Sequence, residues 1–270
     1  YFGAEEALSA LRKQVQTWLE QRLPLDELSS GLTPRFFRSR DLDHRLNYQS
    51  AEQACVANTL LEDFQCLPLS QLAELSPAFE ATNSAESEDS SASSVIKIGH
   101  LDGQQSIKLP DTRVEPSWRV HKRPLRRFDV LLSTFAQEPK VALVSHEPES
   151  RTLVSEQLAV IQFHRTPGAY ALLLETPFVR EQINRLATGM VQRFVQPRML
   201  GGLVLPPIDE SLAKQWHRQL LELLEAKTKA DQKLDKLSEK MFEVYRKVHP
   251  MMDELNKQAQ PSNDGEQVNG

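Results

Sequence analysis

The stretch DESLAKQWHRQLLELLEAKTKADQKLDKLSEKMFEVYRKVH, residues 209–249, sets the architecture of this 270-residue chain. Its apolar side chains recur at alternating steps of four and three residues, which is the heptad repeat of a coiled-coil helix. Such a helix is about 60 Å long and needs a second helix, from this chain or from a partner, to cover its apolar seam. We expect the helix–partner interface at Trp216, Leu220, Leu223, Leu234, Leu237, Met241, Val244 and Val248.

The residues before this helix predict a β-rich domain with flanking helices. Residues 4–22 place their apolar groups on one helical face, and Pro24 ends that helix. Residues 168–187 predict a second helix, interrupted near Pro177. Short apolar runs bounded by turn residues predict strands at 95–98, 128–133, 140–145, 158–164 and 202–206. The fold class is therefore α+β.

These elements divide the chain into four parts. We expect an N-terminal helix, a β-rich domain, the long coiled-coil helix and a flexible tail, over residues 1–25, 26–207, 208–249 and 250–270 respectively. Within the domain, TNSAESEDSSASS at 82–94 has no large apolar residue, so we expect a flexible insert there.

Charge is distributed unevenly along the chain, whose net charge is −5. Residues 1–96 carry 7 Lys and Arg against 15 Asp and Glu, whereas residues 97–198 carry 15 against 10. The middle block is therefore basic although the whole chain is acidic. Its densest segment, residues 119–127, holds Arg119, His121, Lys122, Arg123, Arg126 and Arg127. Such a cluster is typical of a surface that binds an anionic partner.

Motifs for catalysis or metal binding are missing from the sequence. It contains no HExxH, no P-loop, no GxSxG and no GxGxxG, and Cys55 and Cys66 form no CxxC pair. We therefore expect no catalytic residue, no metal site and no enzyme activity. The sequence holds no apolar run of ~20 residues, and we expect no leader sequence, so we expect a cytoplasmic protein without a membrane partner.

Four stretches carry a resemblance to a known family. They are CLPLSQLAELSPAFE (66–80), VIKIGHLDG (95–103), RRFDVLLSTFAQEPKVALV (126–144) and YALLLETPFVREQINRLATGMVQRFVQPRMLGGLVLPPID (170–209). Together with the long helix, they resemble the target-recognition domain and conserved helix of type I restriction-modification specificity subunits, in a single-domain or half-subunit form. Phe128 stands where that family usually has Gly.

The resemblance implies a function in a phage-defence complex. The chain would read a DNA half-site and dock adenine-specific DNA methyltransferase subunits through its long helix. It would hold no cofactor itself, because S-adenosylmethionine would bind to the methyltransferase. The resemblance also implies a second recognition domain, which would come from a second copy, from another specificity chain paired through the long helix, or from residues that this sequence lacks. It further implies a restriction nuclease or helicase subunit in the assembly.

The chemistry of DNA contact suggests two groups of residues. Basic side chains neutralise phosphates, while side chains with paired donors and acceptors read base edges. For phosphate contact we expect Arg119, Lys122, Arg123, Arg126 and Arg127. For base contact we expect Thr134, Thr188, Gln192, Arg193 and Gln196.

Several alternatives remain open at this point. The basic segment fits a solvated turn without a ligand, and Arg193 fits a cap on the preceding helix or a pair with Glu181. Aromatic residues Phe163, Tyr170, Phe178 and Phe194 are expected in the core. The whole chain also fits a coiled-coil assembly adaptor, or a recognition-domain mimic, that binds methyltransferase subunits without reading DNA.

Overall fold

A four-stranded antiparallel sheet lies at the centre of the fold, with strand order β2-β9-β6-β7. The computed structural model describes residues 2–23, 25, 57, 59–76, 79–81, 94–108, 119–121, 123–148, 151–189 and 193–258. The strands of the central sheet are β2 (Ala73–Leu75), β6 (Val130–Ser133), β7 (Val141–Leu143) and β9 (Leu158–Phe163). β6 and β7 pair as an antiparallel hairpin and fall within the strands expected at 128–133 and 140–145.

Three two-stranded sheets complete the β structure. β4 (Ser94–Ile96) and β8 (Thr152–Val154) are parallel, whereas β3 (Phe79–Ala81) and β5 (Arg119–His121) are antiparallel. β1 (Leu67–Pro68) pairs with β10 (Val204–Leu205). This pairing brings the first and last strands of the β-rich domain together. The remaining short elements are α4 (Leu69–Leu72), η3 (Ile98–His100) and η4 (Pro197–Gly202).

Two helices follow the central sheet, as the interruption near Pro177 predicted. α5 (Pro167–Leu174) and α6 (Pro177–Leu186) each begin at a proline, a residue favoured in the first turn because its missing N–H has no partner there. α5 is buried over nearly all its length and contacts β6, β7 and β9. The main core therefore lies between this sheet and its helices, and it includes Val130, Ile161 and Leu173.

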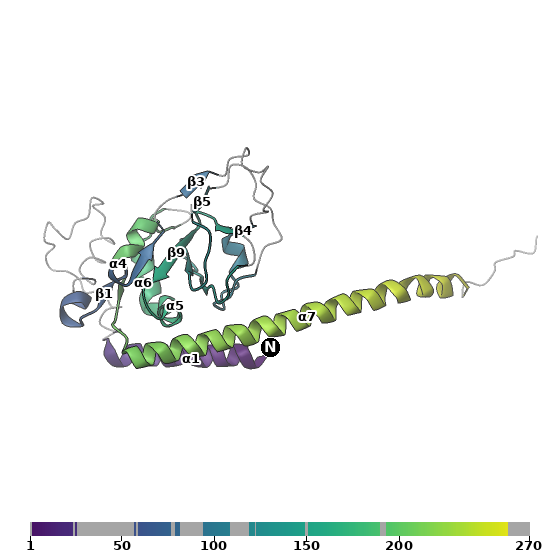
Figure 1. The fold of residues 1–270 in the computed structure, drawn as a ribbon, viewed down its shortest axis with the longest axis horizontal. Coiled ribbons are helices and arrows are strands. Elements are labelled where there is room, and N and C mark those ends of the chain that lie inside the picture. Colours follow the sequence, from purple (N-terminus) through teal and green to yellow (C-terminus); the bar gives the residue numbers. More distant parts are fainter. Residues whose placement is uncertain are drawn as a thin grey trace, which may run out of the picture. The chain divides into compact units, whose positions relative to one another are not determined.

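The N-terminal helix α1 (Phe2–Arg22) runs alongside the beginning of α7 (Glu210–Gln258) (Figure 1). Trp18 meets Trp216 edge-to-face, with ring centroids 5.3 Å apart, and Arg22 forms a 2.8 Å ion pair with Asp209. The end of α1 therefore lies beside the beginning of α7, so the two helices are antiparallel. The chain itself supplies a helical partner for the first part of the heptad seam.

A forked ion pair fixes α1 to the domain. Arg12 donates from Nε and Nη2 to the two oxygens of Glu175, each at 2.7 Å, and Nη2 also reaches the Gly103 carbonyl at 3.0 Å. Glu175 is buried at the end of α5, where its charge needs a partner. Arg12 therefore connects α1 to both α5 and the loop at residue 103.

The compact units differ from the expected domains. One unit comprises residues 2–225, and the other comprises residue 1 and residues 226–270. α1 and the start of α7 contribute side chains to the core of the β-rich domain, and the expected boundaries at 25 and 207 stay predictions. Helix α7 also continues nine residues past its expected end at 249. Pro250 removes one backbone hydrogen bond, which a long helix tolerates. The expected insert, except for Ser94, and the last twelve residues lie outside the described part.

Candidate nucleic-acid interface

A buried carboxylate organises the turn that enters β6. Asp129 is almost inaccessible, and its two oxygens accept hydrogen bonds from Arg123 Nη1 at 2.9 Å and Arg123 Nη2 at 3.0 Å. The same carboxylate accepts the backbone N–H of Arg126 at 2.8 Å. Arg123 therefore neutralises a buried charge and fixes the turn. Both terminal nitrogens of its guanidinium are engaged with Asp129, and its expected phosphate contact stays a prediction.

The turn held by Asp129 exposes two neighbouring arginines. The Arg126 side chain makes no hydrogen bond or ion pair with any residue in the described part of the chain. The Arg127 guanidinium lies over the Phe128 ring, 4.5 Å from its centroid, and its Nε donates to the Ser145 carbonyl. Both side chains are exposed, so both remain positioned for phosphate contact.

Phe128 adopts a conformation that glycine would adopt more easily. Its φ is +70°, in the left-handed region that disfavours bulky residues. The ring meets His217 of α7 edge-to-face, with centroids 5.4 Å apart. Burial, with the positive charge of Arg127, lowers the pKa of His217.

The rest of the basic segment divides between surface and core. Arg119 is exposed and forms a 3.0 Å ion pair with Glu156, and such exposed pairs contribute little to stability. His121 is fully buried, with Nε2 2.6 Å from the Leu158 carbonyl, and burial lowers its pKa. Lys122 lies outside the described residues. The exposed, described members of the cluster are therefore Arg119, Arg126 and Arg127.

The expected base-contact residues gather at the other end of β6. Val195 donates to the Thr134 carbonyl at 2.8 Å, and Ala136 donates to the Arg193 carbonyl at 3.0 Å. The loop after α6 thus runs beside the segment that leaves β6, and Thr188, Arg193 and Gln196 lie near Thr134. Residues 123–129 form the basic turn, which lies before β6, whereas Thr134 follows β6. The strand therefore separates the base-contact group from the basic turn.

Most side chains of this second group take part in the fold. The Thr134 hydroxyl is buried and donates to the Gln157 carbonyl at 3.0 Å, and its expected base contact stays a prediction. Arg193 donates to the Asn184 carbonyl in the last turn of α6, which is the capping alternative. Gln196 accepts a hydrogen bond from Arg198 at 3.0 Å. Thr188 is half-buried, and Gln192 lies outside the described residues.

Phe194 is the residue of this loop whose exposure the sequence did not indicate. It was expected in the core, as Phe163 and Phe178 are, but 42% of it is exposed. Its neighbour Val195 is fully buried. The alternation of an exposed and a buried residue follows from the extended backbone of this segment. The apolar character of Phe194 gave no sign of which of the two would face solvent.

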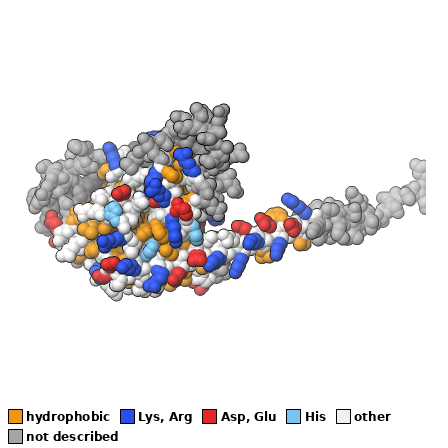
Figure 2. Space-filling view, in the orientation of Figure 1, with side chains coloured by type: hydrophobic (Ala, Val, Ile, Leu, Met, Phe, Trp, Pro, Cys, Tyr) orange, Lys and Arg blue, Asp and Glu red, His pale blue; other side chains and the backbone are white. Residues whose placement is uncertain are grey.

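The expected helix–partner residues fall into three groups. Trp216 and Leu220 are buried in the core with α1, and Leu223 packs partly against that core. In contrast, Leu234, Leu237, Met241 and Val244 are all exposed along α7, where Figure 2 shows apolar side chains among acidic and basic ones. Val248 lies in the helix, but its side chain is outside the described part.

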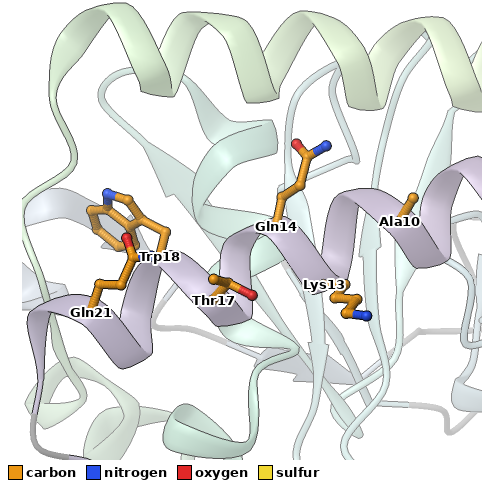
Figure 3. A pocket seen from close by; sticks show the side chains of 6 residues that line it. All are labelled: Ala10, Lys13, Gln14, Thr17, Trp18 and Gln21. Carbon is orange, nitrogen blue, oxygen red and sulfur yellow. The ribbon is translucent and has the colours of Figure 1, made fainter.

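Cavities and charged clusters point to no other site among the described residues. A shallow depression of about 410 Å³ lies along α1 (Figure 3), and its lining comes from that helix alone: Ala10, Lys13, Gln14, Thr17, Trp18 and Gln21. No group of three or more His, Cys, Asp or Glu in the described part could hold a metal ion. None of the described helices is both long and apolar enough to cross a membrane.

The sequence was also compared with known proteins. No protein-family model matches the chain, and no curated protein matches it.

Proposed function

We propose that this chain is the sequence-specific DNA-recognition subunit of an adenine-methylation or restriction complex. The observation that carries the proposal is the basic turn, in which buried Asp129 holds Arg123 and thereby presents Arg126 and Arg127 to solvent. Two adjacent exposed guanidinium groups on a fixed backbone suit contact with successive phosphates. The family resemblance of the sequence supports the same assignment.

The rigidity of the basic turn favours binding of an anionic partner. Burying the Asp129 carboxylate is costly, and Arg123 compensates that cost with a forked pair. The same carboxylate binds the N–H of Arg126, so the turn has little freedom next to the residues that would contact DNA. A rigid turn loses less conformational entropy on binding than a mobile one.

The exposed part of α7 supports the docking half of the proposal. Apart from Phe194, every exposed large hydrophobic side chain among the described residues lies on this helix between Leu234 and Tyr245. We propose that this surface pairs with a helix of a methyltransferase subunit, or of a second recognition chain. S-adenosylmethionine would then bind to the methyltransferase.

Salt-dependent DNA binding tests the proposal. The full chain would be titrated with a fluorescent duplex of about 30 base pairs at several salt concentrations, because each phosphate contact contributes about 0.9 to the slope of log K against log salt. We expect the double variant Arg126→Gln/Arg127→Gln to lose about 2 from this slope and to bind all sequences more weakly. Lys13→Gln, which removes an exposed charge from α1, is the control. An unchanged slope in the double variant would refute the phosphate assignment.

A second candidate function is a coiled-coil adaptor that never reads DNA. The exposed apolar seam of α7 and the net charge of −5 favour it. Selection from a random duplex library with the full chain separates the two functions. An enriched half-site motif is expected of a DNA reader, whereas an adaptor or recognition-domain mimic enriches none.

A further inference from the structure

Phe194 is the one exposed large hydrophobic side chain that the structure describes within residues 2–225. It lies on the loop after α6, in the group of residues expected to contact bases. An exposed apolar residue on a surface needs no special explanation by itself. What distinguishes Phe194 is the way in which its backbone is held.

Hydrogen bonds fix the backbone of Phe194 on both sides. Its N–H donates to the Thr188 carbonyl at 2.9 Å, and its carbonyl accepts the N–H of Thr188, also at 2.9 Å. A further bridge pairs Phe194 with Phe135 at the end of β6. The next residue, Val195, is buried and donates to the Thr134 carbonyl. The ring therefore projects from a segment anchored to the central sheet.

The polar neighbours of Phe194 are engaged within the protein. Arg193 caps α6 at Asn184, and the Thr134 hydroxyl donates to Gln157. Gln196 accepts from Arg198. Three of the side chains expected to contact bases, Thr134, Arg193 and Gln196, thus have hydrogen-bond partners within the protein.

We infer that Phe194 is a specificity-determining residue that contacts the C5-methyl group of a thymine in the major groove. The thymine methyl is the one apolar group on a base edge in that groove, and it marks T·A pairs. The inference rests on the proposed function, since it assumes that the chain reads DNA. A ring on an anchored backbone suits this task because it pays little entropy when it becomes ordered against a base.

Removing the methyl group from the DNA tests the inference without changing the protein. The half-site enriched by the full chain would be synthesised with deoxyuridine in place of each thymine in turn. At one position, wild-type protein should bind the uracil duplex roughly fourfold more weakly, the value for one buried methyl group. Phe194→Ala should bind both duplexes equally, and Phe194→Leu should restore part of the discrimination. Loss of a methyl contact leaves the salt slope unchanged.

A matched variant and two distinct negative results complete the design. Lys13→Ala, which removes an exposed side chain from α1, is the matched variant and should keep the discrimination of wild type. If wild-type protein enriches no half-site, the proposed function itself fails. If it enriches a half-site but Phe194→Ala discriminates thymine from uracil as wild type does, or if wild type tolerates uracil at every position, the inference about Phe194 fails while the proposed function stands.

Discussion

The two parts of helix α7 share one heptad pattern but have opposite surroundings. Leu220 is fully buried in the core that α1 completes, whereas Leu237, which also lies on the seam, is 55% exposed. The periodicity of apolar residues is the same in both parts, so it specifies a helix with an apolar stripe in each. Whether the stripe is covered depends on the neighbouring elements, and α1 extends over only 21 residues.

Among single substitutions in α7 and its contacts, Leu220→Ala should lower the free energy of unfolding most. Removing a fully buried leucine side chain leaves a cavity, and we expect the free energy of unfolding to fall by about 2–5 kcal/mol. Urea unfolding followed by circular dichroism would measure it. A loss below about 1 kcal/mol would mean that α1 does not cover this part of the seam in solution.

Gly168→Ala tests a second contact of the buried part of α7. A Cβ at residue 168 would lie 2.7 Å from His217 Nδ1 and 3.2 Å from His217 Cα, and the Gly168 N–H donates to that same Nδ1. Either the helix must shift or the bond must break, so we expect a loss of about 1–3 kcal/mol. Gly202→Ala is the control, because a Cβ there meets nothing within 4 Å. Equal stability of the two variants would contradict the close approach.

Acid should weaken the buried part of the helix through His217. Burial, and then Arg127, lower the pKa of this group below its usual 6.5, so the unfolded chain binds the proton more readily than the folded one. The contribution of neutral His217 to the free energy of unfolding is therefore fully present above pH 6.5. It declines as the pH falls from 6.5 toward the lowered pKa. Unfolding free energies at about pH 7.5 and about pH 5.5 measure the decline.

A substitution at His217 tests whether this residue causes the loss of stability in acid. His217→Asn should be less sensitive to pH than wild type, although His100 and His121, whose pKa values are also lowered by burial, maintain part of the decline. The exposed His146 provides the control in His146→Asn. An identical pH dependence in His217→Asn and wild type would show that His217 does not titrate differently in the folded state.

Leu237→Ala should have the smallest effect on the stability of the isolated chain. The side chain is already exposed, and Ala favours the helix slightly, so we expect a change within about 0.5 kcal/mol. Under the proposed function the same change weakens association with the helical partner. A large destabilisation of the isolated chain would mean that another segment of the chain covers the seam.

Local patterns predicted most elements of the fold but not their partners. The apolar runs located β6, β7, β9 and β10, and Pro177 located the break between α5 and α6. β8 was missed, as were β1, β2, β3 and β5, because none of these short strands lies in an apolar run long enough to be recognised. The parallel pairing of β4 with β8 joins strands that are far apart in the chain, which no local pattern encodes.

In the basic segment too, the sequence indicated which residues are charged but not which partner each one has. Its composition correctly indicated that Arg126 and Arg127 are exposed, but Arg123 and His121 have similar chemistry and take part in the interior. The distinguishing partner of Arg123 is Asp129, only six residues away, yet their pairing depends on the left-handed turn at Phe128. Charge can be counted in a sequence, whereas the partner of each charge depends on the path of the backbone.

Helix and strand formation in this protein follows from the order of residues, because the side-chain periods of 3.6 and 2 are properties of neighbouring positions. That order was enough to predict an α+β chain with a long heptad helix. Burial, pairing and exposure arise between distant segments. Contacts between such segments bring α1 against Trp216, bury Thr134 and leave Phe194 exposed. These outcomes required the three-dimensional packing, since one side chain can be covered only by another that the fold brings beside it.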